Sequence, residues 1–164
     1  MELPVIKLPA KVLRAGTKTV TFPLKKDVKK LLVNMLETVH NVDGIGLAAP
    51  QVASNLNLAL IYLENMKIPA FPIINPVILD TSEETVVVEE GCLSLPGVFG
   101  EVARPKWIKV KFQTTDGEEM VLEDDGWIAR VILHEVDHLQ GILIKDKFLK
   151  ITKGKELLDK KFLN

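Results

Sequence analysis

Cysteine is nearly absent from this sequence: Cys92 is the only one, so no disulfide can form within the chain. This excludes a small secreted domain held together by disulfides. Long hydrophobic runs are also missing, since the longest one near the middle of the chain, residues 58–63, is far too short to cross a bilayer. The first residues lack the charged-then-apolar pattern of a signal peptide. We therefore expect a protein of a reducing, cytoplasmic compartment with no membrane partner.

Neither sign of charge is in excess, because 21 basic and 22 acidic side chains leave a formal net charge of −1. Stable binding to nucleic acid is therefore not expected. Lysines are frequent between residues 145 and 161, but acidic residues are interspersed among them. This pattern indicates a solvated face, and the alternative for it is a transient contact with ribosomal RNA.

The length of 164 residues fits one domain, residues 1–164, with enough apolar side chains for a buried core. Apolar residues recur at helical spacing in residues 25–42 and again in residues 125–140. The stripe predicted to be buried in the first helix consists of Val28, Leu31, Leu32, Met35, Leu36 and Val39. Extended segments are predicted at residues 57–63, 73–79, 85–89, 107–112 and 119–123. Pro76 predicts that the second of these lies at a sheet edge or is interrupted.

Strands gathered in the middle of the chain between two helices predict an α+β fold rather than a βαβ repeat. We expect a single compact domain with mixed or antiparallel strands around a central helix, the one predicted for residues 125–140. The amphipathic helix near the N-terminus and a short C-terminal helix within residues 152–162 complete the predicted fold.

Two of the three histidines, His134 and His138, lie four residues apart in the central helix, and Glu135 directly follows the first. Residues four apart project from the same helix face, so both imidazoles can bind one metal ion. Glu135 then lies beside that ion and can handle the protons of a water molecule. Two histidines satisfied by ordinary hydrogen bonds are the alternative, but burial among apolar neighbours is costly without a coordinated ion. The motif indicates a metal-dependent hydrolase.

A catalytic metal of this kind takes three protein ligands and keeps one position for water. No histidine follows His138, and Glu156 lies in the lysine-rich tail. His40 ends the first predicted helix, where main-chain carbonyls are expected to satisfy it. Cys92 instead lies between glycines and acidic residues at the end of a predicted strand, and a thiolate suits a borderline divalent ion. We therefore predict Cys92 as the third ligand.

A loop of small residues begins at Gly44 and Gly46 and ends at Gln51. It is not a nucleotide-binding loop, because it lacks a preceding strand, a third glycine at the required spacing and a Gly-Lys-Ser/Thr sequence. Small residues here let a substrate backbone approach closely. The amide of Gln51 is a neutral donor suited to a carbonyl oxygen on which charge develops.

Three segments of this chain together resemble the three signature motifs of peptide deformylase, in the same order and at similar separations. They are Gly-Ile-Gly-Leu-Ala-Ala-Pro-Gln (44–51), Glu-Gly-Cys-Leu-Ser (90–94) and His-Glu-Val-Asp-His-Leu-Gln-Gly (134–141). The resemblance covers roughly residues 7–149 and is closest to the compact bacterial type. Leu133 stands where the family often has Gln, and Ala53 where it commonly has Gly. Neither residue is a predicted metal ligand.

The resemblance implies removal of the N-formyl group from the initiator methionine of nascent polypeptides. By motif, it assigns one divalent metal ion to Cys92, His134 and His138. Fe²⁺ is the native ion implied, and Zn²⁺, Ni²⁺ and Co²⁺ are tolerated by such a donor set. Glu135 acts as general base toward water and then delivers the proton to the leaving amine. Formyl-Met nascent peptides are the implied partners, and a monomer is expected.

The resemblance also implies the contacts with the substrate. The Gln51 side chain and the Leu93 backbone N–H stabilise the oxyanion. Main-chain groups of Ile45, Gly46 and Gly91, next to Gly44, hold the peptide in an extended pose.

Residues beside these motifs suggest further roles. Val131 lies one turn before His134 and is predicted to line a hydrophobic pocket for the methionine side chain. Glu90 and Arg104 flank the Cys92 loop, and an ion pair between them would hold the ligand in place. Two solvated surface charges are the alternative. Asp137 is expected either to orient a ligand histidine or to be solvated on its helix.

Two other functions compete with this interpretation. A His-Glu-x-x-His endopeptidase would take its third metal ligand from elsewhere in the chain. A peptide-binding or structural metal module would need a fourth protein ligand, and the sequence has no second cysteine to supply it.

Overall fold

The computed structural model describes residues 1–162. The α-helices are α1 (Lys26–Asn41), α2 (Trp127–Leu139) and α3 (Lys155–Phe162). Short 3-10 helices are η1 (Lys11–Arg14), η2 (Ala49–Val52), η3 (Glu64–Met66) and η4 (Ile144–Asp146). The strands are β1 (Gly46–Ala48), β2 (Leu58–Leu63), β3 (Ile68–Thr81), β4 (Thr85–Cys92), β5 (Leu95–Pro105), β6 (Ile108–Gln113), β7 (Glu119–Asp124) and β8 (Phe148–Lys153).

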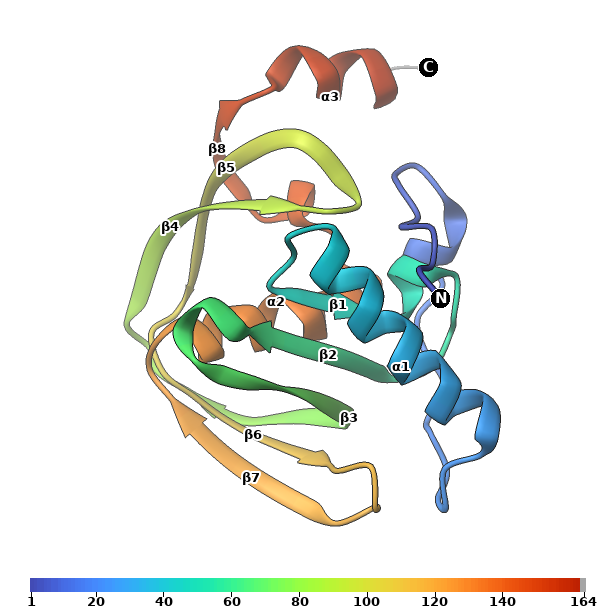
Figure 1. The fold of residues 1–164 in the computed structure, drawn as a ribbon. Coiled ribbons are helices and arrows are strands. Elements are labelled where there is room, and N and C mark those ends of the chain that lie inside the picture. The colour runs from blue at the N-terminus through green and yellow to red at the C-terminus, as the bar shows by residue number, and fades with distance from the viewer. Residues whose placement is uncertain (163–164) are drawn as a thin grey trace.

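The strands form two antiparallel sheets. Five strands pair in the order β1-β2-β3-β6-β7, and three pair in the order β4-β5-β8. Helix α2 lies at the centre of the molecule between the two sheets, and α3 lies beyond β5 and β8 (Figure 1). The α+β class with strands around a central helix, predicted from the sequence, is therefore confirmed.

Strand β2 shows why the apolar run at residues 58–63 is continuous. Alternate side chains of a strand point to opposite faces of the sheet. Ala59 and Ile61 pack in a core cluster with α2, whereas Leu58 and Leu60 pack in a second cluster with α1. Helices α1 and α2 thus cover opposite faces of this part of the sheet (Figure 1). Both faces are buried, so the strand carries apolar residues without alternation.

The amphipathic character of α1 is confirmed with one correction. Val28, Met35 and Val39 are buried in the core cluster that α1 shares with β2. Leu36, predicted to belong to the same stripe, is 40% exposed. In the part of the chain that the structure describes, no helix is long and apolar enough to span a membrane.

Strand β3 corrects the edge position that Pro76 suggested. The strand lies inside the sheet between β2 and β6, but its pairing with β6 shifts register between Ile74 and Val77. Asn75 sits in this irregularity with a positive φ of 51°. The proline, which has no N–H to donate, is therefore accommodated by an interruption, the second of the two predicted possibilities.

Strands β5 and β8 were not predicted. Pro96, Gly97 and Gly100 in β5 resemble turn signals, and they obscure its alternating burial. At Gly100 a Cβ atom would lie 2.7 Å from the main-chain oxygen of Lys150 in β8, so the glycine permits close pairing of the two strands. Part of the segment assigned to a C-terminal helix also belongs to β8, and α3 begins only at Lys155.

The carboxylate of Asp124, the last residue of β7, stabilises the start of α2. Its Oδ2 accepts hydrogen bonds from the main-chain N–H groups of Gly126, at 2.8 Å, and Ala129, at 2.7 Å. The first N–H groups of a helix have no partner inside the helix, so an acceptor here fixes where α2 begins. This start sets the position of both histidines.

We predict that Asp124→Ala lowers the free energy of unfolding by about 1 kcal/mol, the usual cost of losing a carboxylate that accepts from helix N-terminal N–H groups. Urea denaturation measures the loss. Asp125→Ala is the matched control, because Asp125 is exposed, and it should change stability by less than about 0.5 kcal/mol. Equal stability of the two variants would contradict the prediction.

Candidate metal centre and active site

Three donor side chains converge between β4 and α2. Cys92 is the last residue of β4, and His134 and His138 project from one face of α2. One ligand atom from each lies within 4.8 Å of the other two, and Cys92 Sγ is 3.2 Å from His138 Nε2. The structure therefore brings together the thiol and the two imidazoles that the sequence predicted as a set.

The chemistry of this cluster fits a metal ion. Burial alone would raise the pKa of the Cys92 thiol, but the neighbouring imidazoles of His138 and His134 outweigh burial and lower the pKa well below its usual value. The cluster thus offers one anionic sulfur and two nitrogens, which suit a borderline divalent ion. Buried Glu135 Oε2 beside it has no hydrogen-bond partner among the described residues. Such an atom is expected where water or an ion belongs.

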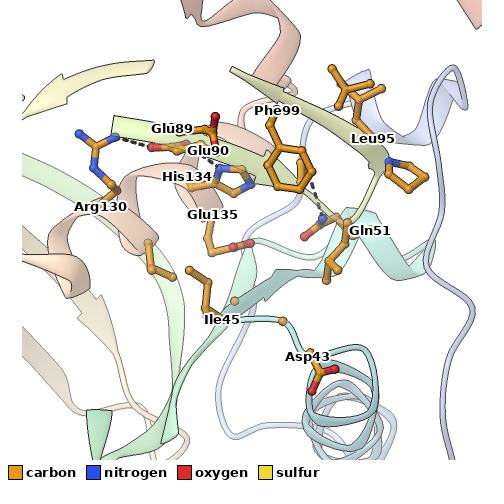
Figure 2. A pocket seen from close by; sticks show the side chains of 18 of the residues that line it. Asp43, Ile45, Gln51, Glu89, Glu90, Leu95, Phe99, Arg130, His134 and Glu135 are labelled. Atoms are coloured by element: carbon orange, nitrogen blue, oxygen red, sulfur yellow. Dashed lines mark hydrogen bonds and ion pairs between the residues drawn. The ribbon is translucent and has the colours of Figure 1, made fainter. Parts of the chain in front are cut away.

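Glu135 lies in the middle of the cavity, between the wall that carries His134 and the loop that carries Ile45 (Figure 2). Its side chain is buried, and burial raises the pKa of its carboxyl to about 7, although both imidazoles partly offset this. A Cβ atom on Gly46 would lie 2.4 Å from Glu135 Oε1, so only glycine lets the loop pass this close. A carboxyl with such a pKa can accept and return a proton near neutral pH.

Gln51 reaches the site from η2. Its Oε1 accepts a hydrogen bond from the Ala48 N–H at 2.8 Å, which fixes the orientation of the amide. Its Nε2 then points to Ser94 Oγ at 3.2 Å and to Cys92 Sγ at 3.7 Å. The predicted amide donor therefore lies beside the cluster of Cys92, His134 and His138, and Ser94 is a neighbour to which the sequence alone assigned no role.

A buried ion-pair network stands behind His134. Glu90 accepts two hydrogen bonds from Arg104, at 2.7 and 2.9 Å, and one from Arg130 Nη1 at 2.5 Å. Glu90 Oε2 is also 3.2 Å from His134 Nδ1. Burial opposes ionisation of Glu90, but its hydrogen bonds with His134 and Arg104 lower its pKa to about 2. The predicted pair of Glu90 and Arg104 is thus present and buried, not a pair of solvated charges.

Asp137 and His40 have partners other than those expected. Asp137 Oδ2 accepts a hydrogen bond from Arg104 Nη1 at 2.8 Å and forms none with a histidine among the described residues. Asp137 is therefore connected to Glu90 and His134 through Arg104. His40 Nδ1 lies 2.6 Å from the hydroxyl of Tyr62, so a side chain and not a carbonyl satisfies this histidine, which does not belong to the group of Cys92, His134 and His138.

The cluster opens into a cavity of about 480 Å³. The predicted substrate-contact residues Gly44, Ile45, Gly46, Gly91 and Val131 all line it, as do Gln51 and Leu93. Figure 2 shows Glu90, His134 and Phe99 along one wall and Ile45 on the opposite side. An extended peptide can therefore lie between the loop before β1 and the end of β4.

Several lining residues were missed by reasoning from the sequence. Trp127 and Arg130 belong to the first turn of α2, and Phe99 belongs to β5. Arg130 lies four residues before His134, so helical spacing alone places it on the same face. Nothing local in the sequence indicates that Phe99 packs against Gly91, where a Cβ atom would lie 2.6 Å from its ring.

A Cys-His-His donor set beside a buried carboxyl, open to a cavity, is typical of a metal-dependent hydrolase. The family model for Polypeptide deformylase matches residues 2–154. A peptide deformylase of Thermotoga maritima is 45% identical over 152 residues, which are 93% of this chain and 88% of the relative. Peptide deformylase 1 of Bacillus cereus is 41% identical over 155 residues, 94% of this chain and 97% of the relative.

Solved structures that are similar to this chain are also peptide deformylases. The crystal structure of the Thermotoga maritima peptide deformylase has a TM-score of 0.85 and 42% identity, covering 90% of this chain and 98% of that one. The crystal structure of the Synechococcus elongatus peptide deformylase in complex with actinonin has a TM-score of 0.88 and 40% identity. The match covers 97% of this chain and 85% of that one. The chain therefore belongs to the polypeptide deformylase family. It is a hydrolase that removes the N-formyl group from nascent polypeptides, a reaction for which this family uses a catalytic metal.

We predict that Glu90→Gln weakens metal binding about 10- to 100-fold, because the charged acceptor that orients His134 is lost. Competition with a metal chelator measures this affinity. Glu84→Gln is the matched control, since Glu84 pairs with Lys106 at the surface, and it should bind metal like the unsubstituted protein. Unchanged affinity in Glu90→Gln would show that the network does not orient the ligand.

Proposed function

We propose that Cys92, His134 and His138 hold one divalent metal ion and that Glu135 transfers the proton in hydrolysis of the N-formyl group. The observation that carries this proposal is the convergence of the three donor atoms within 4.8 Å, beside a buried carboxyl and inside a cavity open to a peptide. In this proposal the whole chain, residues 1–164, acts as one catalytic domain.

In the proposed reaction the metal site activates water and Glu135 transfers the proton. A divalent ion at this donor set supplies Lewis-acid activation of water and of the formyl oxygen. Glu135 accepts a proton from the attacking water and returns it to the nitrogen of methionine as the C–N bond breaks. Formate and a free amino terminus are the products. A carboxyl with a pKa of about 7 suits both the acceptance and the return of the proton.

Two donors are proposed to stabilise the oxygen of the formyl group as negative charge develops there. One is the Gln51 amide, which already points at the ligand cluster. The other is the main-chain N–H of Leu93, which follows the cysteine ligand and lines the cavity. Donors fixed before the reaction need no reorganisation during it.

Main-chain groups of Ile45, Gly46 and Gly91 are proposed to hold the peptide in an extended pose. They line the cavity from opposite sides, with Ile45 just before β1, Gly46 at its start and Gly91 near the end of β4. The Val131 side chain would contact the methionine of the substrate. In an extended peptide the main-chain groups and the side chains point in different directions, so the main chain of the substrate and its methionine side chain contact different residues of the protein.

We further propose Fe²⁺ as the native ion, with Zn²⁺, Ni²⁺ and Co²⁺ as ions that the same donors accept. The partners are formyl-Met nascent peptides. We propose a monomeric enzyme, and a location in the cytoplasm agrees with the free thiol of Cys92. Exposed Lys150, Lys153 and Lys155 support a transient ribosome contact.

Replacing the proton carrier tests the chemistry. We predict that Glu135→Gln binds metal normally but releases formate from formyl-Met-Ala-Ser about 10²- to 10⁴-fold more slowly, because the amide has no proton-accepting oxygen of suitable pKa. Formate release and metal content are measured on the same anaerobic preparation. A metal-loaded variant with nearly full turnover would refute the role of Glu135.

Replacing the sulfur separates this function from an endopeptidase. We predict that Cys92→Ala loses most of its metal and its formate release, because two imidazoles alone bind the ion weakly. Metal content by elemental analysis provides the measurement. Ser94→Ala, a change in the same loop, should keep its metal. If Cys92→Ala retained a full complement of metal, the third ligand would be another residue and the endopeptidase alternative would be favoured.

A further inference from the structure

The guanidinium of Arg130 is held from three directions. Arg130 is only 8% exposed, and its Nη1 donates to Glu90 Oε1 at 2.5 Å and to the Val102 oxygen at 3.3 Å. Its Nη2 donates to the Val86 oxygen at 2.6 Å. Figure 2 shows this side chain pointing along the wall toward Glu90. With the charged head fixed, the aliphatic stem of the arginine is left to face the cavity.

Arg130 stands between two cavities. It lines the active-site cavity and also an outer cavity of about 200 Å³, and Trp127 is the only other residue common to both linings. The outer cavity is otherwise bounded by Val86, Val88, Pro105, Lys106, Asp125 and Gly126. The side chains of Trp127 and Arg130 therefore form the partition between the two spaces.

A methionine side chain placed beside Val131, as proposed above, would point toward this partition. A Cβ atom on Gly46 would lie 2.9 Å from Val131 Cγ1 and 2.4 Å from Glu135 Oε1, so the loop that is proposed to hold the peptide passes directly over both residues. A side chain that enters beside Val131 continues along α2 toward Arg130, one residue earlier, and Trp127, one turn earlier.

We propose that Arg130 is a specificity-determining residue that closes the far end of the methionine pocket and so limits the length of the side chain accepted. The proposal rests on the function proposed above, in which Val131 contacts the methionine. The anchored stem acts as an end wall, because moving it would break the hydrogen bonds of Arg130 to Glu90 and to the main-chain oxygens of Val86 and Val102.

The test compares two substrates in one variant. We expect Arg130→Ala to join the two cavities and admit a side chain longer than methionine. The substrates are formyl-Met-Ala-Ser and the same peptide with an n-hexyl side chain in place of that of methionine. The ratio of their kcat/KM values, measured by formate release, should shift about 10-fold or more toward the longer side chain. Such a ratio does not depend on how much of the variant is folded.

Arg104→Lys is the matched control. Arg104 pairs with the same Glu90 carboxylate but lines neither cavity. We expect it to reduce turnover while leaving the substrate ratio as in the unsubstituted enzyme. An unchanged substrate ratio in Arg130→Ala would overturn the proposal. An equal shift of the ratio in Arg104→Lys would also overturn it, because the change in specificity would then come from the disturbed Glu90 carboxylate that both arginines contact. If the unsubstituted enzyme released formate from neither peptide, the proposed function would fail and this inference with it.

Discussion

The carboxylate of Glu90 is the point at which three elements of this fold are joined. It belongs to β4, its bidentate partner Arg104 belongs to β5, and Arg130 and His134 belong to α2. Cys92 follows Glu90 by two residues, so the same interaction holds the sulfur next to the helix that carries the imidazoles. An unpaired carboxylate at this depth would cost several kcal/mol. The network therefore holds β4, with Cys92 at its end, against the helix that carries His134 and His138.

Helix α2 is buried on both sides, although one of its faces is apolar and the other carries ionisable side chains. One of its faces packs against the large sheet through Ile132 and Val136. The other presents a carboxyl and two imidazoles that would be expensive to bury alone. The ion pairs with Glu90 and the thiol of Cys92 compensate that polar face. A central helix can thus carry polar chemistry because a three-stranded sheet, covering that face, supplies the complementary charges.

Close approach of main chain to side chain shapes the substrate path. Gly46 lies against Glu135 and Val131, and Gly91 lies against Phe99, at distances that exclude any larger residue without rearrangement. The two glycines bring the walls of the cavity near the reacting groups. Side chains of the first turn of α2, Trp127 and Arg130, line the same cavity although they lie outside the three family motifs.

The periodicity of the sequence determined several local features of this protein. The histidines four residues apart, the alternation of residues 108–113 and the apolar stripe of α1 follow from 3.6 and 2 residues per repeat, and the sequence displays these directly. Elimination of the other candidate ligands predicted Cys92, the chemistry of the small-residue loop indicated Gln51, and the resemblance to a known family agreed with both. Tertiary structure alone decided that β5 and β8 pair, that Pro76 falls in an irregular central strand, and that Arg130 joins Glu90. Glu90 and Arg130 are separated by 40 residues. No short-range pattern in the sequence shows which distant side chain will donate a hydrogen bond to a buried carboxylate.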